Sequence, residues 1–396
     1  MLLGGIHYLL PVIKAAHEQG YYVITADNVP DNVAHKHSDE YVNVSIVDKE
    51  AVLAAAQERA IDGIISFGVD PGVEAAAYVQ EQMHLPSMGP YESVRILQNK
   101  DLFRAFLRDN GFNVPQARGY VSVEEALSDT DWLQWPMIVK PTDSAGSKGV
   151  TRVDRIEDYE TALKLAFAKS IKGHIIVEQF IEQKGYQTGS DSFMLDGHLA
   201  FVSYDNQIFD STASNPYTPA AHVWPTMMPD EEQRYLTNEL QRLLSLLHMG
   251  TSILNIEARV GVDDKVYIME VAPRGGGNRL SEVLRYATGV DMITAQVRAA
   301  VADSVDGIEQ RPYDGYWANI ILHSPLDGIF GGIEISEKMW PDIRDKFFYK
   351  QIGEPISGFK AANEAIGSLF MRFETKKSVE YAAMCQNEWL KILVEK

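Results

Sequence analysis

Residues 255–274 read NIEARVGVDDKVYIMEVAPR, and the interpretation of the whole chain starts from this stretch. It contains two apolar, strand-like runs at 255–260 and 266–271, separated by a short polar segment. Asp263 and Asp264 within that segment predict a two-residue turn of a β-hairpin. The two runs are therefore expected to pair as antiparallel strands.

In that register Glu257 lies directly opposite Glu270 on one face of the hairpin, with Cβ atoms ~5 Å apart. Like charges in this position destabilise a sheet unless a cation lies between them. Two carboxylates on one face suit Mg²⁺, whose other ligands would be water and substrate phosphate oxygens. The pair predicts a magnesium site, and the alternative is two solvated acids on an exposed face.

Residues 274–278, Arg-Gly-Gly-Gly-Asn, follow the second run directly. Successive glycines let the backbone approach a ligand closely, while the guanidinium of Arg274 can stabilise phosphate charge. Substrate contacts in this segment are expected at Gly276, Gly277 and Asn278. Arg259, which strand alternation puts on the Glu257 face, could hold a substrate carboxylate or form a structural ion pair.

A second phosphate-binding pattern lies in the middle of the chain. Residues 137–141 read as a strand that contains Lys140 near its end, and a loop rich in Gly and Ser follows at 142–149. Such a loop can turn its backbone N–H groups toward phosphate oxygens, while the lysine reaches the α- and β-phosphates. It is not a Walker A motif, because G-x-x-x-x-G-K-[ST] occurs nowhere in the chain. A plain hairpin turn is the alternative for the loop taken alone.

Residues 175–178 form another buried-looking strand, which ends in Glu178 and leads into Gln179, Phe180 and Ile181. A carboxylate and available backbone groups at the end of a strand are what the edge of an adenine ring requires. For this stretch alone, an exposed acid at the edge of a sheet is the alternative.

The first ninety residues follow a strand–helix alternation. Strands are expected at 1–3, 21–26 and 63–67, and a helical pattern ends at Gly20. This alternation predicts a parallel, doubly wound sheet, whose binding crevice is lined by polar residues just after the strands. The candidates are Gly4, Gly5, Asp27 and Asp70, each of which could equally be a turn residue. The dinucleotide fingerprint G-x-G-x-x-G is missing after the first strand, which argues against a dehydrogenase.

In this order along the chain, the parts resemble the ATP-grasp superfamily, and most closely its carboxylate–amine ligase branch. That branch includes carbamoyl-phosphate synthetase, the purine-pathway ligases and many amino-acid ligases. The resemblance covers roughly residues 1–300 and rests on Asn99-Lys100-Asp101, Ile138-Val139-Lys140-Pro141, the Gly/Ser loop, Glu178-Gln179-Phe180-Ile181, Glu257 and Glu270-x-x-Pro-Arg274.

The resemblance implies an α/β ATP-grasp fold with an N-terminal doubly wound parallel-sheet (Rossmann-like) domain, a small α+β lid and a C-terminal antiparallel-sheet ATP-binding core. The expected division is a Rossmann-like domain at 1–94, a linker helix at 95–117, the lid at 118–183, the core with the metal site at 184–300 and a C-terminal subdomain at 301–396.

The resemblance also implies roles for single residues. Contacts to ATP are expected at Lys100, Lys140, Ser144, Gly146, Ser147, Gly149, Glu178, Gln179, Phe180, Ile181 and Gln187. Glu257 and Glu270 would hold Mg²⁺, and Arg274 and Lys140 would be catalytic by stabilising the transferring phosphoryl group. Two departures stand out: Gln187 replaces the family's ribose-binding acid, and Ala272 replaces the Asn of Glu-x-Asn-Pro-Arg. Asn278 is a candidate stand-in for that Asn.

The implied reaction needs ATP and Mg²⁺. A substrate carboxylate attacks the γ-phosphate, giving an acyl phosphate and ADP, and an amine then displaces phosphate to form an amide. Positioning and charge neutralisation suffice for the first step, so no nucleophilic side chain is required. An amino acid is the expected substrate class. The alternatives are a catalytically inactive ATP-binding regulatory module, and an ATP-grasp carboxylase or thiol ligase.

Composition limits the partners. The chain has 396 residues, a formal net charge of −19 and a single cysteine, Cys385. So acidic a surface argues against nucleic acid and membrane partners, and no apolar run approaches the ~18 residues that span a bilayer. One cysteine excludes an internal disulfide, and a reducing, cytoplasmic location is expected. The expected partners are a small-molecule carboxylate and amine, and a homodimer is left open.

Overall fold

The computed structural model describes residues 1–143 and 148–395, and it contains a parallel N-terminal sheet. The strand order β3-β2-β1-β4 reverses at β1, as in a doubly wound sheet. The strands are β1 (Leu2–Leu3), β2 (Ile24–Asp27), β3 (Glu40–Asn43) and β4 (Ile65–Ser66). The helices of this unit are α1 (Leu10–Glu18), α2 (Lys49–Glu58) and α3 (Val73–Gln82).

Two helices, rather than the expected single linker helix, lead out of this unit. They are α4 (Tyr91–Gln98) and α5 (Lys100–Asp109). Asn99 between them is extended, with φ −113° and ψ 112°, so the helical hydrogen-bond pattern stops there and restarts at Lys100. Lys100 is therefore the first residue of a new helix, and its backbone N–H donates to the Thr142 carbonyl at 3.4 Å.

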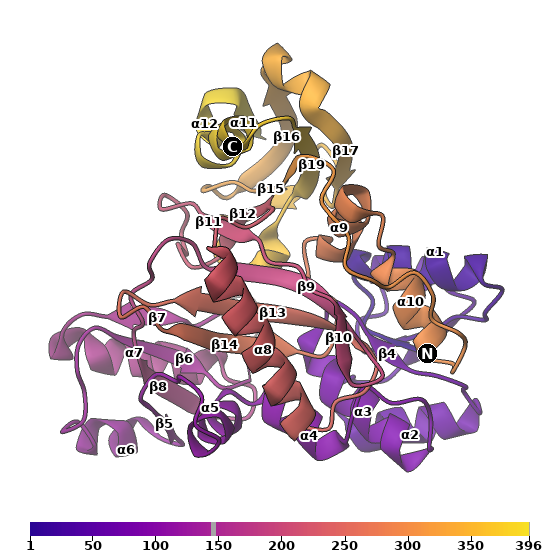
Figure 1. The fold of residues 1–396 in the computed structure, drawn as a ribbon, viewed down its shortest axis with the longest axis horizontal. Helices are drawn as coiled ribbons and strands as arrows, with labels where there is room; N and C mark the ends of the chain where they lie inside the picture. Colours follow the sequence, from indigo (N-terminus) through magenta and orange to yellow (C-terminus); the bar gives the residue numbers. More distant parts are fainter. Residues whose placement is uncertain (144–147, 396) are drawn as a thin grey trace.

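The lid is an antiparallel sheet with the strand order β5-β8-β6-β7. Its elements are β5 (Ala117–Tyr120), α6 (Val123–Ser128), β6 (Met137–Pro141), β7 (Thr151–Val153), α7 (Ile156–Lys169) and β8 (Ile175–Gln179). Both helices pack on one side of the sheet through a small core of their own, centred on Tyr159 and Leu163. Figure 1 shows the lid at the lower left, the N-terminal unit at the lower right and the strands of the core sheet in the middle of the molecule.

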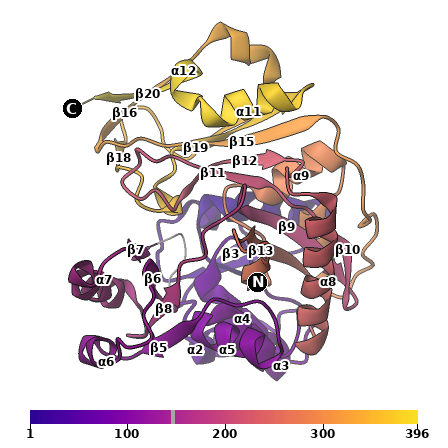
Figure 2. The same cartoon turned by 60° about the vertical axis from the view of Figure 1, so that its left-hand side comes forward.

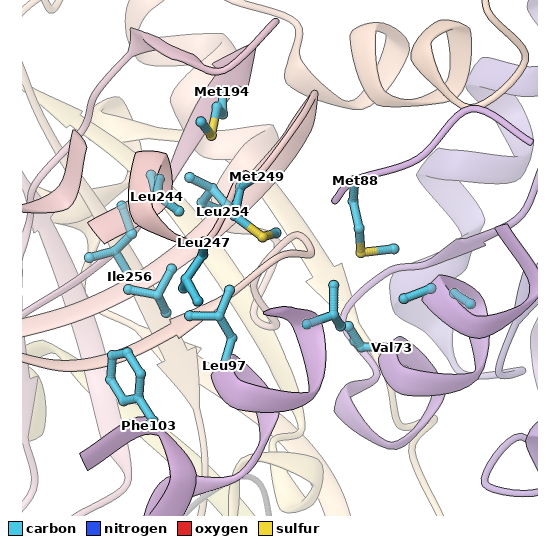
Figure 3. Close-up of a cluster of buried hydrophobic side chains, with 14 of the residues drawn as sticks. Val73, Met88, Leu97, Phe103, Met194, Leu244, Leu247, Met249, Leu254 and Ile256 are labelled. Carbon is cyan, nitrogen blue, oxygen red and sulfur yellow. The ribbon is translucent and has the colours of Figure 1, made fainter. Parts of the chain in front are cut away.

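The core sheet is antiparallel, in the order β10-β9-β13-β14. It consists of β9 (Thr188–Leu195), β10 (His198–Phe201), β13 (Ser252–Val260) and β14 (Val266–Ala272), and α8 (Asp230–Leu246) runs across it. Figure 3 shows Leu97 and Phe103 of α4 and α5 pointing toward Leu247 and Ile256 of the core. This shared apolar cluster joins the N-terminal unit and the core sheet.

A further sheet covers the other side of the core. Its order is β11-β12-β15-β19-β17, with β11 (Asn206–Phe209), β12 (Pro219–Trp224), β15 (Tyr316–Leu322), β17 (Ile343–Phe348) and β19 (Gly367–Phe373). Two of these strands precede residue 300 and three follow it, so one sheet spans the boundary expected there. Figure 2 shows α11 on its outer face.

The remaining elements complete the C-terminal part. A small sheet has the order β18-β16-β20, formed by β16 (Gly328–Ile335), β18 (Pro355–Ile356) and β20 (Leu390–Glu395). The helices are α9 (Leu280–Thr288), α10 (Met292–Ala299), α11 (Lys376–Met384) and α12 (Gln386–Trp389). Short 3-10 helices are η1 (His7–Leu9), η2 (Val33–Lys36), η3 (Asp70–Gly72), η4 (Glu337–Asp342) and η5 (Ala362–Glu364). Among the described helices, none is both long and apolar enough to cross a bilayer.

Phe103 anchors the cluster between the N-terminal unit and the core, and its side chain is 1% exposed. We expect Phe103→Ala to lower the free energy of unfolding by about 3–5 kcal/mol, since truncation leaves a cavity that the rigid surroundings fill only in part. Urea unfolding monitored by fluorescence measures the change. Val262→Ala is the control, because Val262 lies at the hairpin tip and is 60% exposed. Its free energy of unfolding should stay within about 0.5 kcal/mol of that of the parent chain.

Candidate functional site

The β13–β14 hairpin brings Glu257 and Glu270 into direct register, as predicted. The predicted two-residue turn is wrong, however. Gly261 and Lys265 close the hairpin, and Asp264 adopts a left-handed conformation at the end of a three-residue connection. That turn alone would put Glu257 opposite Met269.

A β-bulge restores the pairing. Ala258 pairs with Ile268, whereas Glu257 pairs with Glu270, so Met269 is an extra residue in β14. The carbonyl of Met269 accepts a hydrogen bond of 2.8 Å from Arg104 Nη1. The bulge therefore decides which side chain faces Glu257, and an arginine of α5 satisfies its displaced backbone.

The carboxylate pair carries unequal charge. Burial and the neighbouring Glu270 raise the pKa of Glu257 to about 7. Burial alone would raise the pKa of Glu270 as well, but Lys100 and Arg274 lower it. Lys100 Nζ lies 3.3 Å from Glu270 Oε2. Ionising both carboxylates is thus costly until a further cation lies between them.

The donor set fits Mg²⁺. Within residues 1–143 and 148–395, no group of three or more His, Cys, Asp or Glu side chains is arranged to hold a metal ion. Glu257 and Glu270 would therefore supply two oxygen ligands only. Mg²⁺ is commonly held in this way, by one or two carboxylates with substrate phosphates and water completing its octahedron.

Lys140 is held by a buried ion-pair cluster. Its Nζ contacts Glu178 Oε1, and Arg104 Nε donates to Glu178 Oε2 at 3.0 Å. Burial would raise the pKa of Glu178, but the two cations lower it to about 2. Burial lowers the pKa of Lys140 to about 8, so the pair stays charged at neutral pH. Both oxygens of the expected adenine-binding carboxylate are occupied by cations in this structure.

Arg104 was missed by the sequence reasoning, although a signal was present. Positions 100, 103, 104 and 107 share one face of α5, and Phe103 and Leu107 make that face apolar. A lysine and an arginine on a buried helical face require acidic partners. Here the partners are Glu270 for Lys100 and Glu178 for Arg104.

The rest of the expected nucleotide segment is tied into the sheets. Gln179 N–H donates to the Gln116 carbonyl at 2.8 Å, and Phe180 N–H to the Pro136 carbonyl at 3.1 Å. Arg259 Nη1 donates to the Ile181 carbonyl at 3.1 Å. Its other η nitrogen contacts Gln187 Oε1. Arg259 therefore holds the segment expected to bind ATP through two contacts, and its substrate role stays a prediction.

Part of the expected phosphate loop lies outside the described residues, namely Ser144, Gly146 and Ser147. Gly149 is described and has φ +74°, a conformation that favours glycine. A Cβ at this position would come within 2.9 Å of Lys169 Cβ, so packing against α7 also requires glycine here.

Arg274 joins the core to the N-terminal unit. Its Nε and Nη2 donate to the two oxygens of Asp70 at 2.8 Å each. Asp70, Lys100 and Glu270 all line one cleft, which the lid residues Asp143 and Lys172 also border. Two predicted candidates from distant parts of the chain, the strand-end Asp70 and the arginine, thus meet in a bidentate ion pair at this cleft.

The glycine run is held by contacts that the sequence did not reveal. A Cβ on Gly275 would come within 2.3 Å of the Phe67 ring. Gly276 N–H donates to the buried Asp191 at 2.8 Å, and Asn278 Oδ1 accepts from Tyr8 Oη at 3.0 Å. A Cβ on Gly277 would come within 3.4 Å of the Tyr8 ring.

The remaining N-terminal candidates shape their own loops. Gly4 N–H donates to the Ala26 carbonyl at 2.8 Å, and a Cβ on Gly5 would meet the side chains of Asn32 and His35 at 2.5 Å. Asp27 accepts from Asn32 Nδ2 at 2.8 Å. Among the candidates that follow strands of the parallel sheet, Asp70 therefore has the direct contact with the core.

We expect Arg104→Met to lower the free energy of unfolding by about 3–5 kcal/mol at pH 7, because it leaves Glu178 buried with one cation. The depressed pKa of Glu178 contributes stability above its usual pKa near 4.5, and this contribution, roughly 3 kcal/mol, is lost as pH falls toward 2. The variant should therefore lose less stability than the parent chain between pH 4.5 and 2. Denaturant titrations across that range measure both effects.

Arg108→Met on the same helix is the matched control, because its ion pair with Asp109 is exposed. It should change stability by less than about 0.5 kcal/mol at either pH. Equal effects of the two substitutions would show that the buried Arg104–Glu178 pair contributes no more to stability than an exposed ion pair.

Known proteins share this architecture. A family model of the ATP-grasp domain matches residues 133–282. The carbamoyl phosphate synthase large chain of Pseudothermotoga lettingae is 22% identical over 308 residues, which cover 77% of this chain and 27% of that protein. The large chain of Thermomicrobium roseum is 24% identical over 330 residues, covering 79% and 29%. The chain thus spans less than a third of the length of these relatives.

Solved structures match over the full chain. The L-amino acid ligase of Bacillus licheniformis superposes with a TM-score of 0.81 at 20% identity, covering 100% of this chain and 98% of that one. Phosphoribosylglycinamide synthetase of Anaerococcus prevotii gives a TM-score of 0.76 at 19% identity, with the same coverage. The chain therefore carries an ATP-grasp domain within an ATP-grasp fold, as its motifs predicted.

Proposed function

We propose that the chain is an ATP- and Mg²⁺-dependent ligase that joins a carboxylate to an amine through an acyl phosphate, with an amino acid as one substrate. The observation that carries the proposal is the opposition of Glu257 and Glu270 beside Lys100, inside an ATP-grasp domain. A pair of partly buried carboxylates whose joint ionisation is costly is suited to a divalent cation and to the phosphates that come with it.

Each charged residue has a task in phosphoryl transfer. Glu257 and Glu270 would hold Mg²⁺, which when bound neutralises charge on phosphate oxygens. Glu178 holds Lys140, and Glu270 holds Lys100. Both lysines place positive charge near the Glu257–Glu270 pair. Arg274 is oriented by a bidentate ion pair with Asp70, which lines the cleft together with Lys100 and Glu270. Such fixed charges stabilise a transferring phosphoryl group without reorganising.

The substrate class is argued from a solved structure. An L-amino acid ligase is among the solved structures that this chain matches from end to end, which supports an amino acid as the carboxylate. Carboxyaminoimidazole ribonucleotide synthetase and a biotin carboxylase domain share the fold too, so a carboxylase is a second candidate. A cytoplasmic location and a homodimer stay predictions.

A non-catalytic nucleotide-binding module is favoured by one observation. Gln187, at the position expected to bind ribose, is 6% exposed and held between Arg259 and Gln207. Arg259 and Gln207 therefore compete with a ribose hydroxyl for the Gln187 amide. Retention of both lysines, both glutamates and Arg274 supports catalysis instead.

The test is ADP release from Mg²⁺-ATP in the presence of pooled amino acids and small carboxylates. The ligase predicts release that depends on a carboxylate, and an amide product once an amine is present. Release that depends on bicarbonate alone would favour a carboxylase. A thermal shift by ATP without any release would favour the non-catalytic module.

Glu270→Gln should reduce carboxylate-dependent ADP release at least ~100-fold, because it removes both a proposed metal ligand and the partner of Lys100. Circular dichroism should show an intact fold. Glu334→Gln is the control, since it removes an exposed strand glutamate that is paired with Lys391. Unchanged turnover in Glu270→Gln would contradict the metal assignment.

A further inference from the structure

Two buried polar atoms without a hydrogen-bond partner, in the part of the chain that the structure describes, belong to residues paired in register. They are Nε2 of His222 on β12 and Oδ1 of Asn319 on β15. His222 is 3% exposed and Asn319 is fully buried. Directly paired residues in an antiparallel sheet point to the same face. A buried polar atom left unpaired is costly, so two acceptors on paired residues fit a bound group that donates hydrogen bonds.

A buried aspartate orients the histidine. Asp205 Oδ2 lies 2.6 Å from His222 Nδ1. Its other oxygen accepts from Thr188 Oγ1 at 3.0 Å and from Gly189 N–H at 2.5 Å, so the carboxylate is fixed. A carboxylate accepts hydrogen bonds and does not donate them, so Nδ1 of His222 carries the proton. In the neutral imidazole the unpartnered Nε2 then presents a lone pair, and its residue is paired in register with that of a second acceptor, Asn319 Oδ1.

Both residues connect to the proposed reaction site, from opposite sides. Gly189, which Asp205 holds, pairs directly with Glu257 across β9 and β13. Asn319 Nδ2 donates to the carbonyl of Asn278, four residues beyond Arg274. The His222–Asn319 pair is thus linked through Asp205 and Gly189 to the strand that carries Glu257, and through Asn278 to the segment that follows Arg274.

We propose that His222 and Asn319 bind the amine substrate and that His222 accepts the proton which the attacking nitrogen releases. The inference rests on the proposed ligase function. Two acceptors match the N–H groups of an amine, whereas a carboxylate or phosphate would be repelled by them. The Asp205–His222 arrangement is that of a general base with an orienting carboxylate behind it.

The step balances as follows. The neutral amine forms a C–N bond to the carbonyl carbon of the acyl phosphate, and the C–O bond to phosphate breaks. The electron pair of that bond leaves with inorganic phosphate. One N–H proton passes to Nε2 of His222, and the resulting imidazolium is stabilised by Asp205. No other reactant is required.

The experiment compares two nucleophiles in the complete chain with Mg²⁺-ATP and a carboxylate found to support ADP release. Hydroxylamine, a weakly basic nucleophile that attacks without a general base, traps the acyl phosphate as a hydroxamate. Ammonium or an amino acid gives an amide. We expect His222→Asn, which can keep the hydrogen bond to Asp205, and His222→Gln to lower amide formation ~100-fold or more while hydroxamate formation changes less than ~3-fold.

His198→Gln, at an exposed position of β10, is the control and should leave both products unchanged. Equal losses of hydroxamate and amide in the His222 variants, or no loss of amide, would overturn the proposal. If neither variant folds, amide formation by the parent chain should slow in D₂O while hydroxamate formation does not, and equal rates in the two solvents would overturn it. Absence of hydroxamate from the parent chain with every carboxylate would instead refute the proposed ligase function.

Discussion

The opposition of two carboxylates across one hairpin is the constraint on which the surrounding structure depends. Glu257 and Glu270 face each other only because a bulge at Met269 corrects the register set by a three-residue turn. Two like charges side by side in a partly buried site are tolerable only with cations close by, and Lys100 and Arg274 are the cations that lower the pKa of Glu270. The hairpin therefore determines where helix α5 and the segment after β14 must lie.

Arg104 links this constraint to the lid. One nitrogen of its guanidinium satisfies the bulge carbonyl of Met269, while another holds Glu178, which in turn holds Lys140. The residue that binds the bulge carbonyl next to Glu270 thus also contacts the partner of Lys140, the lysine expected to meet ATP. Through these contacts one guanidinium joins the core hairpin to the lid strand that carries Glu178.

The sequence was informative wherever a local pattern carries the chemistry. The facing glutamates, the strand before Lys140 and the Arg-Gly-Gly-Gly segment were predicted because strand alternation and turn length act over a few residues. Arg104, Asp191 and the Asp205–His222 pair escaped prediction because their partners are distant in the chain. The turn at Asp263 and Asp264 was misjudged, since the bulge that compensates for it has no signature in the residues themselves.

The sheet that spans residue 300 combines strands from two regions that the sequence analysis assigned to separate parts of the chain. Strands β11 and β12 come from the region assigned to the core, yet they pair with β15 and β19 of the last hundred residues. The sequence around Asn319 does not mark it as a functional residue. Its proposed role follows from its pairing with His222 on the neighbouring strand and from its hydrogen bond to the carbonyl of Asn278. The proposed substrate-binding role thus depends on two strands together. Each strand taken alone has the mostly apolar sequence of a buried strand and does not predict it.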